Sequence, residues 1–433
     1  MQFYKNRLYR KLISVKNHLQ KIKELDYFSI VSLKAINSYT VYLNLLIQKF
    51  DEIDPSIILK IYSDLHFNIS PSIRFLQRST TDNIPWSMVS CLDELLNEHL
   101  GEKYLLLFRP QWNFNYSVLI YCLIETLKEK AKKIFPFDEE LINKSFSDEK
   151  IHVFSFPYLE KTNVLLHSVI GHEIGHFYHA KWFDKNNTKI KINSILSKLI
   201  AYYSDKNEKD LIKPIESAKH GIEIIKGMCR EMFSDIIGYY IFGPSMLFSL
   251  FYISIFEEKL DLPSKINNYY PTIKYRIRVL YEKFYKKEQK IKNIKNTNLS
   301  EIITFINDKI EDYLYDKKDL KFIYKYEKEI KYFEELKEDF NKEITGIQKK
   351  FTIEEDKIFY LYDNLNNGFP INEYKNKPVD IYEILYVGWL KYFDYIESTH
   401  TENYVHNYQT IMRLLLKSLN SSYIHKKYLE KIK

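Results

Sequence analysis

The stretch 167-HSVIGHEIGHFYHAKWF-183 decides what kind of fold this chain can adopt, because it is apolar at helical spacing and carries two histidines four residues apart. Positions i and i+4 lie on one face of a helix, so the imidazole rings of His172 and His176 could reach a single metal ion. Glu173 is turned about 100° from His172, where its carboxylate could take a proton from a water bound to that ion. The stretch therefore predicts a buried helix that holds a metal ion.

A metal ion bound by two histidines needs a third ligand, and the segment 227-GMCREMFSDIIGYYIFG-243 offers one. Glu231 and Asp235 are again four residues apart on one face of an expected helix. Two acids in an otherwise apolar helix are costly unless something positive meets them. Glu231 as the third ligand and Asp235 as the hydrogen-bond partner of a ligand histidine would satisfy both acids.

Other assignments stay open at the level of the sequence. His220 and Cys229 are conceivable third ligands, whereas His179 lies too far along its helix to share the ion easily. The two acids of the second segment could instead form salt bridges with the nearby Lys226 or Arg230.

Together the two segments resemble the gluzincin metallopeptidases, whose signature is HExxH on one helix followed by ExxxD on the next. The resemblance implies a zinc ion (Zn²⁺) held by His172, His176 and Glu231, with Glu173 as general base and Asp235 supporting the first histidine. It covers about residues 150–240 and implies membership of an uncharacterised prokaryotic subgroup.

The resemblance also has consequences for the segments around the two motifs. It implies that the strand before the HExxH helix, 151-IHVFSFPY-158, is the sheet edge along which an extended peptide substrate lies. The 54 residues between His176 and Glu231 exceed the link found in many gluzincins. This gap predicts an insertion that could cover or shape the cleft.

Gluzincins also stabilise the oxyanion of the tetrahedral intermediate with a Tyr, His or Arg side chain. In 267-NNYYPTIKYRIRVL-280 the candidates are Tyr269, Tyr270 and Arg276. Tyr270 stands where similar prokaryotic HExxH proteins have the histidine of an HPPxxxR motif, so we expect Tyr270 and Arg276 among the catalytic residues. The alternative is a proline that starts a helix and an arginine in a structural salt bridge.

Glycine and proline are scarce, with 10 Gly and 12 Pro in 433 residues. Few residues can form tight turns, which argues against an all-β fold, and no GxGxxG or GxxxxGK[ST] motif marks a nucleotide-binding sheet. We predict a mainly α (α+β) fold with a small sheet beside the zinc-binding helix pair. Gly171, Gly175, Gly227 and Gly238 fall on the two metal-binding segments, which predicts that their helices approach closely.

Shifts in composition and breaks in periodicity divide the chain into four regions. They are an N-terminal helical region with a short strand (1–145), a metallopeptidase core (146–281), a charged long-helix hairpin (282–351) and a C-terminal helical region that packs on the core (352–433). Apolar positions from Tyr326 onwards step by three or four, which predicts a long helix within a hairpin that projects from the body.

Two segments raise the question of a membrane. The run 236–256 has no charge over 21 residues, but Gly243-Pro244 divides it, which favours two core helices over one membrane span. The basic segment 1–26 has apolar residues at helical spacing, which favours an amphipathic helix of the fold over a membrane-surface helix.

These observations predict a zinc-dependent peptidase that hydrolyses peptide bonds in a peptide or protein substrate. The alternatives are a non-enzymatic, metal-stabilised helical scaffold or interaction protein that binds a protein partner through the hairpin 282–351, and a membrane-embedded protease. The 64 basic and 57 acidic residues nearly cancel, so we expect neither nucleic acid nor membrane as a partner. Three widely spaced cysteines fit a reducing compartment, and we expect a cytoplasmic, prokaryotic protein.

Overall fold

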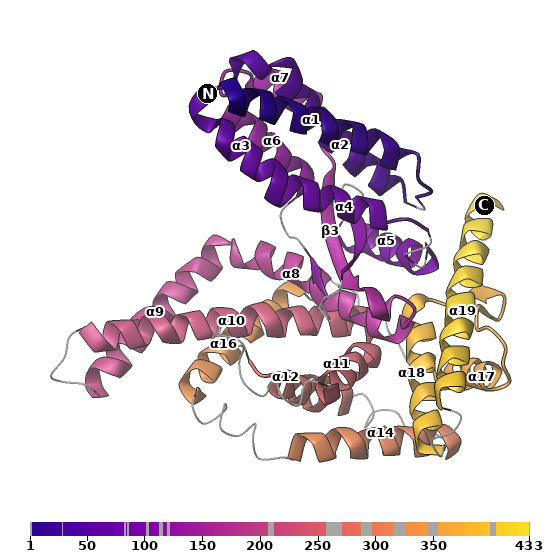
Figure 1. Ribbon diagram of the computed structural model, residues 1–433. Helices are drawn as coiled ribbons and strands as arrows, with labels where there is room; N and C mark the ends of the chain where they lie inside the picture. Colours follow the sequence, from indigo (N-terminus) through magenta and orange to yellow (C-terminus); the bar gives the residue numbers. More distant parts are fainter. Residues whose placement is uncertain are drawn as a thin grey trace. The chain divides into compact units, whose positions relative to one another are not determined.

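The computed structural model shows a mostly helical chain with a small sheet, which confirms the predicted fold class (Figure 1). The structure describes residues 2–27, 29–81, 84, 86–100, 104–111, 116–118, 122–206, 212–256, 271–286, 297–315, 326–344, 354–398 and 404–432. The chain divides into two compact units, Met1–Thr162 (unit 1) and Asn163–Lys433 (unit 2). The finer division into four regions stays a prediction.

Unit 1 consists of helices and a three-stranded sheet. Its helices are α1 (Gln2–Lys23), α2 (Ile30–Gln48), α3 (Ile58–Asp64), α4 (Ser70–Arg78), α5 (Trp86–Leu100), α6 (Leu123–Ile134) and α7 (Glu139–Ser145). The first helix packs against α2 and α3 through an apolar stripe at helical spacing, as predicted. The buried residues of this stripe are Leu8, Leu12, Val15, Leu19 and Ile22.

The sheet of unit 1 contains β1 (Tyr104–Gln111), β2 (Ser117–Val118) and β3 (Lys150–Pro157) in the order β1-β3-β2. β3 pairs with β1 in parallel along its whole length, and with β2 in antiparallel fashion at Phe154 and Ser155. The expectation that this strand forms a sheet edge is therefore wrong. Residues 151–157 of β3 are all buried, which is typical of a strand inside a sheet, and β1 takes its backbone hydrogen bonds on one side.

Unit 2 contains the two motif helices and the helices that surround them. These are α8 (Ile170–Phe183), α9 (Asn186–Lys206), α10 (Ile212–Phe242), α11 (Pro244–Phe256), α12 (Ile273–Leu280), α14 (Thr297–Tyr315), α16 (Glu327–Ile344), α17 (Glu355–Asn366), α18 (Ile381–Ser398) and α19 (Tyr404–Ile432). A short hairpin, β4 (Glu373–Tyr374) and β5 (Lys377–Pro378), follows α17. The HExxH motif lies on α8 and the ExxxD motif on α10, and the described residues between the motifs belong mostly to the end of α8, to α9 and to the first part of α10.

Three glycines let α8 and α10 pack with their backbones in contact. A Cβ atom added to Gly175 would lie 2.4 Å from the Cα atom of Ser234, and one added to Gly171 would lie 2.8 Å from the Cα atom of Gly238. A Cβ atom on Gly238 would in turn lie 3.0 Å from the backbone nitrogen of His172. The predicted close approach is confirmed at these positions, because any larger residue would force the helices apart.

The helix α16 belongs to the core of unit 2. Its apolar stripe, which includes Phe333 and Phe340, is buried as the periodicity predicts. The ring of Phe340 stacks on that of Phe233 from α10, with centroids 4.0 Å apart and an interplanar angle of 3°. This helix is therefore not a projecting arm, because its stripe is covered by α10. Residues 316–325 lie outside the described residues, and the hairpin that they would close stays a prediction.

The uncharged run 236–256 is divided as predicted. Helix α10 ends at Phe242, Gly243 has a φ of 58°, which favours glycine, and α11 begins at Pro244. Within the part of the chain that the structure describes, one helix, α2, is long and apolar enough to cross a membrane by length and composition. Of its most apolar window, 56% is buried inside the structure.

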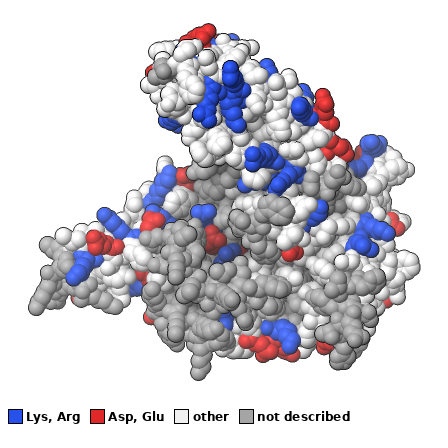
Figure 2. Space-filling model, in the orientation of Figure 1, with Lys and Arg blue, Asp and Glu red and all other residues white. Residues whose placement is uncertain are grey.

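Charged side chains of both signs lie on the described part of one face of the molecule. On the face shown in Figure 2, Lys and Arg atoms and Asp and Glu atoms lie in small groups among uncharged residues. This distribution agrees with the near balance of 64 basic and 57 acidic residues in the sequence.

Candidate metal centre

Three side chains of α8 form a compact cluster of possible metal ligands. The donor atoms of His172, Glu173 and His176 all lie within 4.8 Å of one another, and the three residues are buried. The two imidazole rings are 4.6 Å apart between centroids. One turn of helix therefore brings two nitrogen donors and a carboxylate to one place, as the spacing in the sequence predicts.

The residues of α10 face this cluster. The Oε2 atom of Glu231 lies 3.4 Å from the Nε2 atom of His172, and the Oδ1 atom of Asp235 lies 2.7 Å from the Nδ1 atom of the same ring. Asp235 thus holds one nitrogen of His172, while the other nitrogen faces Glu231. On α10 the structure also brings Ser234 to the cluster, with its Oγ atom 2.8 Å from the Nδ1 atom of His176.

Arg276, at the middle of α12, neutralises the acids of α10. Its Nε and Nη2 atoms donate to the two carboxylate oxygens of Asp235, each at 2.7 Å, and its Nη1 atom lies 3.3 Å from the Oε2 atom of Glu231. Asp235 is completely buried, so its charge depends on these partners. Burial would raise the pKa of Asp235, but the guanidinium of Arg276, and then His172, hold it below its ordinary value.

The two histidines differ in their electrostatic surroundings. Burial alone would lower the pKa of His172, but the charge of Asp235 and its hydrogen bond raise it to about 9. Burial and the neighbouring charge of His172 lower the pKa of His176. For Glu231, burial would raise the pKa, but the hydrogen bond with His172 and the charge of Arg276 hold it well below its ordinary value, so this carboxylate is ionised at neutral pH.

The alternative residues of the sequence analysis lie in other surroundings. His220 is exposed, and Cys229 is fully buried, so that desolvation raises the pKa of its thiol. The ring of His179 lies among aromatic rings, 6.2 Å from that of Phe233. Lys226 pairs with a glutamate on its own helix, and the Nε atom of Arg230 lies 3.8 Å from Glu231. Tyr269 and Tyr270 lie outside the described residues.

The nitrogen and oxygen donors of His172, His176 and Glu231 are of the types that zinc binds. Two imidazole nitrogens and one carboxylate, with a fourth position left for water, are the usual ligands of a catalytic zinc site. Donors bound to one tetrahedral zinc at about 2.0–2.1 Å lie about 3.3–3.4 Å apart, and the distance from His172 Nε2 to Glu231 Oε2 is 3.4 Å. Two imidazole ligands suit zinc better than they suit a hard cation that prefers oxygen ligands, such as Mg²⁺ or Ca²⁺.

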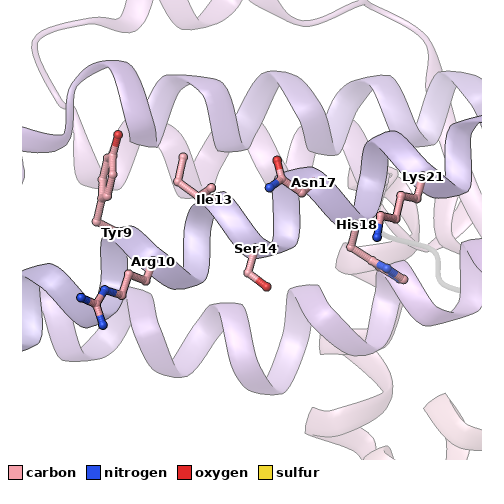
Figure 3. Close-up of a pocket in the computed structure, with 7 residues that line it drawn as sticks. All are labelled: Tyr9, Arg10, Ile13, Ser14, Asn17, His18 and Lys21. Carbon is pink, nitrogen blue, oxygen red and sulfur yellow. The ribbon is translucent and has the colours of Figure 1, made fainter.

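Two cavities of similar size lie in unit 1. A groove of about 640 Å³ follows α1, and its lining residues, all from this helix, are labelled in Figure 3. A second cavity of about 670 Å³ lies between α4 and α6, with Tyr39 and Val153 among its lining residues. Neither cavity includes a residue of the histidine cluster.

No protein family, curated protein or solved structure shows significant similarity to this chain. The structure supports one part of the predicted metal site, the cluster of His172, Glu173 and His176, whose side chains are buried and lie close together. Ser234 is a site residue that the sequence motifs did not predict, although a polar residue in an apolar helix, next to an acid that faces the site, is a signal of a buried hydrogen-bond partner.

Proposed function

We propose that this chain is a zinc-dependent peptidase of the gluzincin type, with His172, His176 and Glu231 as the zinc ligands. The observation that supports this most strongly is the 3.4 Å distance between the Nε2 atom of His172 and the Oε2 atom of Glu231, across two helices and 59 positions of sequence. A partly buried carboxylate and a buried imidazole at the spacing of two zinc donors, next to a second histidine, are what such a site requires.

In the proposed hydrolysis of a peptide bond, the zinc ion and the side chains of the protein have different roles. Zinc bound here would act as a Lewis acid that polarises the substrate carbonyl and makes water a better nucleophile. Glu173 accepts the proton of the attacking water and delivers it to the leaving amine. Asp235, itself held by Arg276, keeps the ring of His172 in the orientation that a ligand needs.

Two side chains are candidates for the group that stabilises the oxyanion. Arg276 already donates to Asp235 and lies near Glu231, so its guanidinium has fewer donors left for a substrate. Tyr270 is the better candidate, since a phenol can donate one hydrogen bond to developing negative charge. A cytoplasmic location in a prokaryote remains part of the proposal, in keeping with the free cysteines Cys91, Cys122 and Cys229.

Cleavage of a peptide library by the zinc-loaded protein tests this function. The wild type is expected to cleave, and Glu173→Gln is expected to lose about 10²- to 10⁴-fold in rate while it keeps its zinc. The matched control is Glu338→Gln, which changes an exposed glutamate on α16 and should cleave like the wild type.

Equal cleavage by wild type and Glu173→Gln would rule out the proposed mechanism. Failure of the zinc-loaded wild type to cleave any library member would favour the alternative of a metal-stabilised scaffold. For such a scaffold, chelation should lower the melting temperature while Glu173→Gln leaves the biological function intact.

A further inference from the structure

We propose that Ser234 is a positioning residue that keeps the proton of His176 on Nδ1 and so leaves Nε2 unprotonated to bind the metal ion. The inference rests on the proposed function in one respect, that His176 is a metal ligand. Ser234 is completely buried on α10 and lies directly opposite Gly175, where the backbones of the two helices are in contact. Its hydroxyl has two polar neighbours, the carbonyl oxygen of Arg230 at 2.7 Å and the Nδ1 atom of His176 at 2.8 Å.

The position of the hydroxyl proton follows from these two distances. Two oxygen atoms 2.7 Å apart need a hydrogen between them, and the carbonyl oxygen of Arg230 has none to give. The proton of Ser234 therefore lies on the bond to Arg230. The Oγ atom can then only accept from His176, so Nδ1 of that ring must be the protonated nitrogen.

As a consequence, both histidines carry a proton on the Nδ1 atom. The Nδ1 atom of His172 lies 2.7 Å from the Oδ1 atom of Asp235, which can only accept, so this nitrogen also carries the proton. The Nη2 atom of Arg276 lies farther from the same nitrogen, at 3.2 Å, and donates to Asp235 at 2.7 Å. Two consecutive residues of α10, Ser234 and Asp235, thus set the same tautomer in both rings. In neutral imidazole the other nitrogen then has a free lone pair, which is the form that binds a metal.

The two partners differ in charge, and this difference gives them different effects. The carboxylate of Asp235 increases the basicity of His172, whereas the neutral hydroxyl of Ser234 only orients His176 and selects its tautomer. The tight contact explains why glycine is needed at position 175, because the backbone atoms of Ser234 lie where a Cβ atom of residue 175 would stand.

Zinc affinity provides the first test. Dissociation constants are measured by competition with a chromogenic chelator for wild type, Ser234→Ala and Ser249→Ala. The control serine is also completely buried and donates to the carbonyl oxygen of Leu165 at 2.9 Å, so it matches the loss of a buried hydroxyl. We expect zinc binding to weaken by about 10- to 100-fold in Ser234→Ala and by less than about threefold in Ser249→Ala.

A spectroscopic test needs neither metal nor activity. In metal-free wild type labelled with ¹⁵N-histidine, the ring of His176 should show the shifts of the Nδ1–H tautomer, and Ser234→Ala should populate the Nε2–H form. An Nε2–H ring in the wild type, or an unchanged zinc affinity in a folded Ser234→Ala variant, would overturn the inference. If the wild type shows the Nδ1–H tautomer but binds no zinc, only the proposed function fails.

Discussion

The substitution Gly175→Ala puts one methyl group where α8 and α10 touch. The new Cβ atom would lie 2.4 Å from the Cα atom of Ser234 and 2.6 Å from its carbonyl oxygen, both of them backbone atoms. The first distance is about 1 Å short of ordinary contact, and backbone atoms in a helix cannot turn aside as a flexible side chain can. The two helices must therefore separate by about 1 Å at this point.

The energetic cost can be worked from this collision. Overpacking of a tight core costs about 1–3 kcal/mol, and a clash with backbone belongs at the upper end. Replacing glycine by alanine within a helix returns up to about 1 kcal/mol of helix propensity. The net loss of about 2 kcal/mol corresponds to a fall in melting temperature of about 4–8 °C for a unit of this size. Zinc binding should weaken by at least about tenfold, because a site tolerates only about 0.5 Å of displacement.

Calorimetric melting of the metal-free protein, followed by a zinc titration, measures both effects. The matched control is Gly221→Ala on α10, whose new Cβ atom would meet only side-chain atoms, the nearest being Oε1 of Glu329 at 3.0 Å. This control should melt at the wild-type temperature or up to about 3 °C higher and bind zinc normally. The reasoning is refuted if Gly175→Ala melts and binds zinc like the control.

Three further predictions concern the rest of unit 2. Removal of zinc by a chelator should lower the free energy of unfolding by about 4 kcal/mol. The reference is protein with free zinc at a thousandfold excess over the dissociation constant, and thermal melting with and without zinc measures the difference. Arg276→Met should cost about 3–5 kcal/mol in urea unfolding of the metal-free protein, because it leaves the buried carboxylate of Asp235 without its guanidinium partner. Phe340→Ala should cost about 3–5 kcal/mol in the same assay, because its ring stacks on that of Phe233 in the core.

Each of these predictions has its own control or contrary result. An equal melting temperature with and without zinc would contradict a metal that binds only the folded state. Arg278→Met is the control for Arg276→Met, since Arg278 donates to a backbone carbonyl and pairs with the exposed Glu282, and it should cost at most about 1 kcal/mol. A Phe340→Ala variant as stable as the wild type would show that α16 does not belong to the core.

The sequence predicted those features that depend on neighbours along one helix. The spacing of His172 and His176 places both rings on one face of the helix. The glycines at 171 and 175 predict a close contact between helices, because only Gly lets two backbones meet. The break after α10 is equally local, since Gly243 and Pro244 cannot continue a helix together.

Features that depend on distant partners could not be predicted in the same way. The strand β3 has a partner on each side, and nothing in its own residues says where those partners lie. The apolar stripe of α16 could be predicted from the spacing of its residues, but the sequence did not show that α10 covers this stripe. Ser234 was visible only as a polar residue in an apolar helix, and its hydrogen bond to His176 depends on the register between α8 and α10.

The most direct test of the central claim is the zinc content of the purified protein after zinc has been supplied and excess removed. The account predicts about one zinc ion per chain for the wild type, and little or none for His176→Ala and for Glu231→Ala, which remove donors from the two different helices. Wild-type protein without stoichiometric zinc, or a Glu231→Ala variant that holds zinc as tightly as the wild type, would contradict the assignment of a metal site shared by α8 and α10.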